Sequence, residues 1–216
     1  MIKLFSENYF MDKPHIGIAG NIGAGKTTLT KKITNRFNWQ PIYESVVDNP
    51  YLVDFYDDMS KWSFNLQIYF LNNRFQNQIK LSKINSGFVQ DRTIYEDKEI
   101  FAKNLRDLKL MSDRDWETYK NLFDNMVQFI RKPDLIIYLK TSTDTLLSRI
   151  QNRDRNFEKN IDPEYIHSLN IYYDKWIAGL ENDKTLIIKT DNFNIFKDID
   201  KLNDIFNVIE KKVNNL

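Results

Sequence analysis

The chain alternates short apolar runs with longer amphipathic ones. The short runs are β-branched or aromatic and mostly apolar on both faces, which is typical of buried strands in a parallel sheet. The expected strands are His15–Ala19, Gln40–Tyr43, Phe88–Gln90, Leu135–Leu139 and Leu186–Lys189. The expected helices are Lys26–Phe37, Tyr51–Asp57, Lys61–Lys83, Asp97–Asn104, Asp113–Ile130, Thr143–Gln151, Pro163–Leu180 and Lys197–Val213.

This alternation predicts an α/β fold in which helices cover a parallel sheet. The 216 residues fit a single domain, and no internal repeat or Pro-, Gly- or Ser-rich linker divides them. Ser112 and Asp115 resemble a capping box at the start of the helix expected from Asp113.

Composition excludes several classes of function. Apolar residues make up 42% of the chain, and 31 Lys and Arg against 30 Asp and Glu give a net charge of +1. The apolar content is enough for a hydrophobic core, and the net charge argues against a general nucleic-acid binder. Cysteine is absent and the histidines are His15 and His167, so disulfides, thiolate zinc sites and a histidine-rich metal centre are excluded.

The chain shows no sign of membrane insertion or export. Its apolar stretches are short, and the start MIKLFSENYFMDKP lacks a cationic segment followed by an apolar block. We therefore expect a cytoplasmic protein with no membrane partner and no nucleic-acid partner.

Glycine is rare and clustered. Six of 216 residues are glycine, under half of the average usage of about 7%, yet Gly17, Gly20, Gly23 and Gly25 fall within nine residues. The segment from Gly20 to Thr27 matches G-x-x-x-x-G-K-S/T between an expected strand and an expected helix. The cluster therefore predicts a phosphate-binding loop, although a plain glycine-rich turn is the alternative.

In such a loop, backbone N–H groups and the helix N-terminus surround phosphate oxygens. Lys26 would reach the β- and γ-phosphates, and the Thr27 hydroxyl would ligate Mg²⁺. The residues expected to bind the nucleotide here are Gly20, Asn21, Ile22, Gly23, Ala24, Gly25, Lys26, Thr27 and Thr28. The motif alone does not say what is done with the nucleotide.

Two carboxylates follow expected strands. Asp91 ends an apolar strand and could hold Mg²⁺ through water; Arg92 follows it, where motor ATPases usually have a glutamate. The GTPase motifs D-x-x-G and N-K-x-D are missing as well, so transfer to a bound acceptor is favoured over hydrolysis. Glu44 ends the second strand and could take a proton from an acceptor hydroxyl, but a capping or surface role fits its position equally well.

A cationic cluster near the end of an expected helix contains Arg149, Arg153 and Arg155. Arg149 and Arg153 would share a face at i, i+4, where like charges repel unless an anion lies between them. This predicts a lid over the transferring phosphate at about 149–160. Cations that complement a helix C-terminus are the alternative.

The helix expected from Lys61 begins with an aromatic stripe, which is more often core than ligand platform. Gln67 and Arg74 interrupt it two turns apart. If buried, both side chains need partners.

Five ordered blocks carry a family resemblance. They are GNIGAGKTT at Gly20–Thr28, ESVVDNPYL at Glu44–Leu52, WSFNLQIYFLNNRF at Trp62–Phe75, DRTIYEDKEIFA at Asp91–Ala102 and RIQNRDRNFE at Arg149–Glu158. The chain resembles the deoxycytidine/deoxyguanosine/deoxyadenosine kinase family of deoxynucleoside kinases, most closely its bacterial-type deoxyadenosine kinases. An N-terminal extension, residues 1–14, and about the last 20 residues carry no motif.

The resemblance implies a P-loop kinase fold with a five-stranded parallel sheet flanked by helices, and an arginine-rich lid. It implies ATP as phosphoryl donor with Mg²⁺, a deoxynucleoside substrate, and a homodimer formed through a helix bundle.

The resemblance also implies roles for single residues. Glu44 matches the carboxylate that activates the 5′-hydroxyl, and Arg92 the arginine that holds it. Asp91 stands where many relatives have Glu, an acid assigned either to Mg²⁺ or to the base role. Tyr56 and Glu158 match the pair that binds the 3′-hydroxyl.

The nucleobase pocket follows in the same way. Gln67 matches an amide that hydrogen-bonds the base, Arg74 and Asp97 a deeper polar pair, and Phe101 an aromatic that stacks on the base. The three arginines of the cationic cluster match lid arginines. The departures are Ser45 where Pro is common, Phe157 where Glu often precedes the sugar-binding Glu, and the large Phe70 facing the base.

The sequence therefore predicts a kinase that phosphorylates the 5′-hydroxyl of a deoxynucleoside, deoxyadenosine first. Its catalytic residues are expected to be Lys26, Glu44, Asp91, Arg92 and Arg153. Preference for deoxycytidine or deoxyguanosine, or a broad specificity, remains open. A nucleoside monophosphate kinase would need more cations where Tyr56 and Gln67 stand, and a regulatory nucleotide switch would have no small-molecule acceptor.

Overall fold

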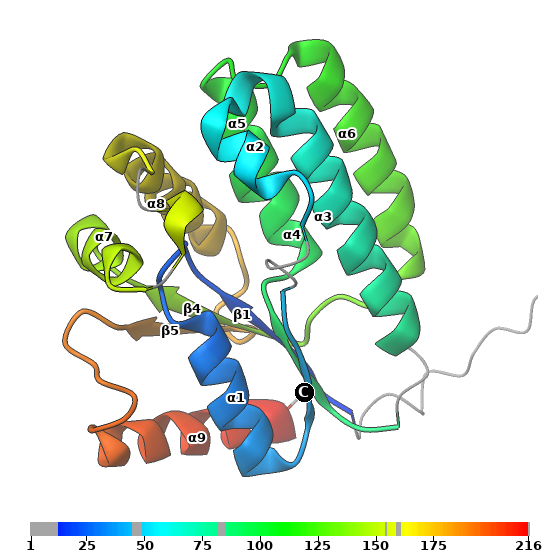
Figure 1. Cartoon of the computed structure of the whole chain (residues 1–216). Helices are drawn as coiled ribbons and strands as arrows, with labels where there is room; N and C mark the ends of the chain where they lie inside the picture. The colour runs from blue at the N-terminus through cyan, green and yellow to red at the C-terminus, as the bar shows by residue number, and fades with distance from the viewer. Residues whose placement is uncertain (1–12, 45–48, 82–84, 154, 159–160, 216) are drawn as a thin grey trace, which may run out of the picture.

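A five-stranded sheet forms the centre of the molecule, as a computed structural model shows for residues 13–44, 49–81, 85–153, 155–158 and 161–215 (Figure 1). Its strands are β1 (His15–Ala19), β2 (Gln40–Ile42), β3 (Phe88–Asp91), β4 (Leu135–Lys140) and β5 (Thr185–Lys189). They pair in the order β2-β3-β1-β4-β5, and every pair is parallel. The expected parallel α/β sheet is confirmed.

Helices cover both faces of this sheet. They are α1 (Lys26–Phe37), α2 (Leu52–Asp57), α3 (Met59–Leu81), α4 (Ile94–Glu96), the π-helix η2 (Asp97–Ala102), α5 (Lys103–Asp107), α6 (Asp113–Met126), the 3₁₀ turns η3 (Val127–Phe129) and η4 (Asn156–Glu158), α7 (Thr143–Gln151), α8 (Pro163–Ala178) and α9 (Ile199–Asn214). In Figure 1, α1 and α9 lie below the sheet, and α3, α4, α6 and α8 lie above it. Within the described residues, no helix is both long and apolar enough to cross a bilayer.

Local polar contacts fix where several helices begin. Ser112 accepts the N–H of Asp115 at 3.1 Å, which confirms the expected cap of α6, and its hydroxyl donates to the Asp115 carboxylate at 2.8 Å. Ser142 caps α7 in the same way. Asp162 caps α8, and Pro163 occupies the first turn, where its missing N–H costs nothing.

The helix expected at Asp97–Asn104 differs most from the structure. It begins at Ile94, because Thr93 and Glu96 form a complete capping box, and continues through the π-helix η2. A hydrophobic pattern does not distinguish π from α geometry. The other helix ends shift by a few residues, such as Ala178 for the expected Leu180. Lys83, Ser45 and most of the expected N-terminal extension, residues 1–12, lie outside the described residues.

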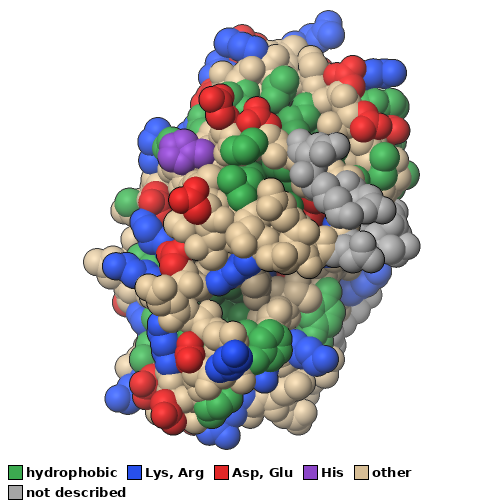
Figure 2. All heavy atoms as spheres, turned by 60° about the vertical axis from the view of Figure 1, so that its left-hand side comes forward, with side chains coloured by type: hydrophobic (Ala, Val, Ile, Leu, Met, Phe, Trp, Pro, Cys, Tyr) green, Lys and Arg blue, Asp and Glu red, His purple; other side chains and the backbone are tan. Residues whose placement is uncertain are grey.

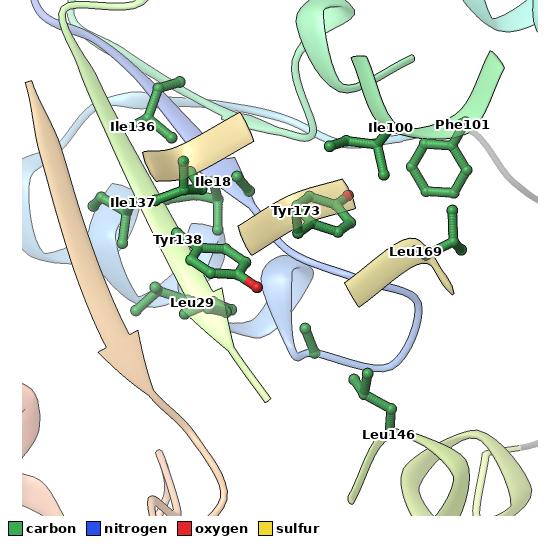
Figure 3. Close-up of a cluster of buried hydrophobic side chains, with 14 of the residues drawn as sticks. Ile18, Leu29, Ile100, Phe101, Ile136, Ile137, Tyr138, Leu146, Leu169 and Tyr173 are labelled. Atoms are coloured by element: carbon green, nitrogen blue, oxygen red, sulfur yellow. The ribbon is translucent and has the colours of Figure 1, made fainter. Parts of the chain in front are cut away.

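One apolar core joins the central strands to the helices that carry the site (Figure 3). Ile18 of β1 and Ile137 of β4 are completely buried. Tyr138 of β4 stacks on Tyr173 of α8, with ring centroids 5.7 Å apart. Figure 3 places Tyr173 beside the η2 side chains, so α8 and η2 are held against the sheet as one unit.

Candidate active site

The phosphate loop joins β1 to α1 and has the backbone geometry that its motif predicts. Gly23 and Gly25 have φ angles of 84° and 98°, in the left-handed region that favours glycine, and Gly25 caps α1. The Lys26 Nζ donates to the Asn21 carbonyl at 3.0 Å. Burial, with Arg92 nearby, lowers the pKa of Lys26 to about 8, so most of it is cationic at neutral pH.

Asn21 holds this loop against α8. Its Nδ2 donates to the Ile166 carbonyl at 2.9 Å and to the Asn170 Oδ1 at 2.8 Å, and its Oδ1 accepts the N–H of Ile22 at 2.7 Å. The side chain is therefore an anchor of the loop.

Asp91 meets the phosphate loop because β1 and β3 pair with Ile18 opposite Asp91. The Thr27 hydroxyl donates to the Asp91 Oδ2 at 2.5 Å. The other oxygen, Oδ1, is buried with no hydrogen-bond partner in the described part of the chain. Burial raises the pKa of Asp91, although Lys26 opposes the shift.

Glu44 lies just beyond β2 between two guanidinium groups. Its Oε1 is 2.6 Å from the Arg74 Nη2 and 3.9 Å from the Arg92 Nε. Burial alone would raise the pKa of Glu44, but Arg92 and Arg74 outweigh it and hold the pKa at about 2. The carboxylate is therefore ionised throughout the neutral range.

Arg92 has a left-handed backbone, with φ at 67°, which is costly for a residue with a side chain. Its N–H donates to the Ile18 carbonyl at 3.1 Å, and its carbonyl accepts from the Arg74 Nη1 at 3.2 Å. Its guanidinium carbon lies 4.1 Å from the ring centroid of Phe101, a favourable cation–π contact. These contacts keep the side chain directed at Glu44.

The part of the site where the resemblance predicts the nucleobase contains the two polar residues that interrupt α3. Gln67 and Arg74 are both buried. The Gln67 Oε1 has no hydrogen-bond partner among the described residues, whereas the Arg74 Nε lies 2.5 Å from the Asp97 Oδ2. Burial raises the pKa of Asp97 to about 6, so its carboxyl group is still ionised at neutral pH.

The part of the site where the resemblance predicts the sugar contains Tyr56, Phe157 and Glu158. The rings of Tyr56 and Phe157 stack with centroids 6.0 Å apart. Glu158 is buried, forms an ion pair with Arg153, and accepts from the Arg155 Nη1 at 3.2 Å. Burial, with other phenol and carboxyl groups nearby, raises the pKa of Tyr56, so its hydroxyl stays protonated and can donate.

The expected arrangement of the cationic cluster is wrong in one respect. Arg149 and Arg153 do not share a helix face, because α7 ends at Gln151. Arg149 instead donates to the Thr190 carbonyl at 2.7 Å and to the Ala24 carbonyl at 3.4 Å. Within the expected lid, 149–160, residues 154, 159 and 160 lie outside the described residues.

A cavity of about 300 Å³ brings most of the predicted site residues together. Its lining includes Ile22, Gly23, Gly25, Lys26, Thr27, Thr28, Glu44, Tyr56, Gln67, Phe70, Asp91, Arg92, Asp97, Phe101, Arg149, Arg153, Arg155 and Glu158. Gly20, Asn21, Ala24 and Arg74 are not part of this lining. Figure 2 shows a hollow across this side of the molecule, with basic side chains beside it.

Sequence reasoning missed two features of the site. A second hollow of about 540 Å³ shares Gly25, Thr28 and Arg149 with the first and is also lined by residues 190–196. Ligands of parallel sheets bind beyond the carboxyl ends of the strands, and that segment follows the last strand. This position in the sequence is the signal that could have revealed the second hollow. The second feature is Glu96, which the T-x-x-E spacing with Thr93 could have revealed as a capping box.

Comparison with known proteins gives matches over most of the chain. The family model described as deoxynucleoside kinase matches residues 16–214. A deoxyadenosine/deoxycytidine kinase of Bacillus subtilis (strain 168) is 36% identical over 211 residues, which cover 97% of each chain. A deoxyadenosine kinase of Dictyostelium discoideum is 48% identical over 170 residues, 79% of this chain and 69% of that one.

Solved structures agree in fold. The deoxyadenosine kinase from M. mycoides, with products dCMP and a flexible dCDP bound, matches with a TM-score of 0.80 and 30% sequence identity. The match covers 94% of this chain and 100% of that chain.

Proposed function

Since this chain belongs to the deoxynucleoside kinase family, and is therefore a phosphotransferase, we propose that its best acceptor is deoxyadenosine. The γ-phosphoryl group of ATP would be transferred to the 5′-hydroxyl in the cavity that joins the phosphate loop to Gln67.

The observation that carries this proposal is the buried Gln67 Oε1, which has no hydrogen-bond partner within the described residues and lies at the proposed base end of the cavity. A carboxamide offers one acceptor and one donor side by side, which match the amino group and ring nitrogen of adenine. Cytosine carries the same two groups, so deoxycytidine is the natural second acceptor. Relatives named deoxyadenosine/deoxycytidine kinase, deoxyadenosine kinase and deoxyguanosine kinase agree with a preference that varies within one pocket design.

The phosphates of ATP would occupy the loop around Lys26, and its base the second hollow beside Arg149. Loop N–H groups and the lysine then neutralise the phosphate charge. Arg153 and Arg155 also line this cavity and would approach the transferring phosphoryl group.

Glu44 would orient the 5′-hydroxyl and accept its proton. A carboxylate whose pKa lies at about 2 is a weak base, so its proton transfer belongs late in a loose transition state. Arg92 and Arg74 keep the carboxylate fixed while the reacting oxygen and phosphorus are held in line.

The residues present also fit Mg²⁺. Asp91 has a buried oxygen to which none of the described residues donates, and the Thr27 hydroxyl lies beside its other oxygen. Across the described chain, no three acidic or histidine side chains cluster closely enough to hold a metal ion by themselves. This suits Mg²⁺, which usually takes one or two protein ligands together with phosphates and water. When bound, it supplies charge neutralisation on the β- and γ-oxygens.

The homodimer remains part of this proposal. α3 packs against α6, and both helices carry large apolar side chains that are partly exposed, Ile79 on α3 and Leu122 on α6. A second copy of the same helix pair would cover them.

Phosphate transfer from labelled ATP tests the function. The acceptors are the four deoxynucleosides, their ribo-forms and their monophosphates. We expect deoxyadenosine to be the best acceptor, deoxycytidine or deoxyguanosine next and thymidine last, with no ATP consumption when the acceptor is omitted. Acceptor-independent consumption would favour a nucleotide switch, and rapid transfer to monophosphates would favour a monophosphate kinase.

The sugar contacts predict a further selectivity. Removing the 3′-hydroxyl should lower kcat/KM by about 10- to 100-fold, because the buried carboxylate of Glu158 then loses the donor that the sugar would supply and keeps only its ion pairs with Arg153 and Arg155. Adenosine should also be poorer than deoxyadenosine, because Tyr56 crowds the 2′ position. Rates on 2′,3′-dideoxyadenosine, adenosine and deoxyadenosine give the comparison, and equal rates on the last two would count against the role of Tyr56.

The lid predicts a distinct kinetic signature. Arg153→Ala should lower kcat more than it raises either KM, by roughly 10- to 1000-fold in kcat, because its charge is used mainly while the phosphoryl group is in transit. Steady-state kinetics on deoxyadenosine test this, with Arg114→Ala on the exposed face of α6 as a matched control. A variant that changes only the nucleoside KM would show that Arg153 serves substrate binding.

A further inference from the structure

Glu96 collects four hydrogen-bond donors from three separate parts of the chain. Its Oε1 accepts the Thr93 N–H at 2.8 Å and the Thr93 hydroxyl at 3.3 Å. Its Oε2 accepts the Gly20 N–H at 3.3 Å and the Tyr173 hydroxyl at 2.8 Å. The side chain is fully buried, and Figure 3 shows Tyr173 on α8 close to the η2 side chains Ile100 and Phe101.

These donors belong to parts that must act together. Thr93 ends the turn Asp91–Thr93, whose first two residues face the phosphate loop and Glu44. Gly20 begins the phosphate loop, and Tyr173 lies on the helix that Asn21 binds. One carboxylate therefore connects the acceptor side of the site, its donor side and α8.

The turn needs such support because Arg92 has a left-handed backbone. Thr93 also packs directly on β1, since a Cβ on Gly17 would lie 2.4 Å from the Thr93 Cγ2. Glu96 then fixes the N–H and the hydroxyl of Thr93 on the other side. The contacts of Thr93 with β1 on one side and with Glu96 on the other thus determine the path of the backbone next to Arg92.

We propose that Glu96 is a positioning residue for phosphoryl transfer, which holds the Asp91–Thr93 turn, Gly20 and α8 in one relative placement. The proposal rests on the roles proposed above for Asp91 and Arg92. Glu96 itself touches neither substrate in this arrangement, because its carboxylate is enclosed by its four donors.

A glutamine at this position has a specific defect. The Thr93 N–H is a fixed donor, so the amide oxygen stays at the Oε1 position and the NH₂ group takes the Oε2 position. There it meets the Gly20 N–H, a second fixed donor, whereas the Tyr173 hydroxyl can rotate and accept. Glu96→Gln therefore keeps the cap of α4 and releases the start of the phosphate loop.

The experiment compares Glu96→Gln with wild type on the deoxynucleoside that the wild type phosphorylates fastest. Active sites are counted by calorimetric titration with that nucleoside. We expect kcat per active site to fall about 10- to 100-fold, the effect of a small misplacement, while both KM values change by less than about threefold. Glu99→Gln is the matched control, because that carboxylate lies on the same helix, pairs with Lys98 and is partly exposed; its kcat should be unchanged.

Tyr173→Phe tests the same proposal a second time, without a change of charge. It removes one donor and should lower kcat about two- to tenfold. Tyr138→Phe is its control, because that hydroxyl donates at 3.1 Å to Asp174, whose side chain is largely exposed. In the Glu96→Gln background, Tyr173→Phe should cost little more, because the contact to the Gly20 N–H, through which the side chain holds the phosphate loop, is already lost.

The proposal is overturned if kcat per active site in Glu96→Gln equals that of wild type, even where the melting temperature falls, because the residue is then purely structural. A rise in the ATP KM without loss of kcat overturns it as well. If Glu96→Gln does not fold, equal kcat values for Tyr173→Phe and Tyr138→Phe overturn it. A wild type that prefers another base contradicts the proposed acceptor and leaves this comparison valid.

Discussion

Replacing Glu44 by glutamine is expected to lower kcat by roughly two to four orders of magnitude, the usual contribution of a general base. Glutamine keeps the shape of the side chain, and its Oε1 can still accept from Arg74. It cannot take the proton of the 5′-hydroxyl. The ATP KM should change little, because Glu44 lies on the acceptor side of the cavity. Single-turnover transfer to deoxyadenosine, with chemistry separated from product release, measures the effect.

Asp91→Asn is the informative comparison for this variant. Asp91 contacts Thr27 of the phosphate loop, so its loss should raise the Mg²⁺ concentration needed for half-maximal rate, whereas Glu44→Gln should leave it unchanged. Glu117→Gln, on the exposed face of α6, controls for a change of net charge. Near-normal turnover in Glu44→Gln, with a large loss in Asp91→Asn, would transfer the base role to Asp91.

The two carboxylates could be located from the sequence but not distinguished by it. Each follows a short apolar run, and parallel strands direct their carboxyl ends to one edge. Their environments differ only in three dimensions: two guanidinium groups from α3 and the turn after β3 flank Glu44, whereas Asp91 faces the phosphate loop. The pKa of Glu44 is therefore lowered and that of Asp91 raised. Opposite pKa shifts of this kind are typical of neighbouring acids that have different roles.

The phosphate loop was predictable because its function lies in a contiguous backbone segment. The backbone at Gly23 and Gly25 has left-handed φ angles, which favour glycine. The clustering of glycine in the sequence is therefore enough to locate the loop. The contact of Arg149 was harder to predict, because its partner Thr190 is 41 residues away on the loop after β5. Helical spacing suggested a pairing with Arg153, but it could not show that α7 ends between the two residues.

Arg74 shows what a pattern along one helix leaves out. Its burial was predictable from its place on an apolar helix, and its partner Asp97 from family resemblance. Its second contact, to Glu44, joins the proposed base pocket to the proposed catalytic carboxylate. That contact arises because Glu44, just beyond β2, and Asp97, at the start of η2, both approach the Arg74 guanidinium, which no local sequence signal records.

Replacing Arg74 and Asp97 together, by Met and Ala, is expected to raise the ratio of thymidine to deoxyadenosine phosphorylation by one or more orders of magnitude. In the wild type, the ionised Asp97 can only accept hydrogen bonds, and thymine presents carbonyl groups and a methyl group. Unpaired buried polar groups of this kind discriminate by several orders of magnitude. The double variant removes both charges, so the pocket no longer penalises a base that presents carbonyl groups to this position. The ratio of kcat/KM for the two nucleosides is the measurement.

The single variants should behave differently, because each leaves a buried charge without its partner. Asp97→Ala leaves the Arg74 Nε without the carboxylate now 2.5 Å away, and Arg74→Met also removes the 2.6 Å contact that orients Glu44. Both should lower kcat/KM for every base without favouring thymidine, and the double variant should keep the lower absolute rate that comes from a less constrained Glu44. The Lys98–Asp124 ion pair, replaced in the same way, is the control for removing a charge pair near η2. A wild type that prefers thymidine, or a double variant with an unchanged ratio, would remove Arg74 and Asp97 from base selection and leave the transfer chemistry at Glu44 intact.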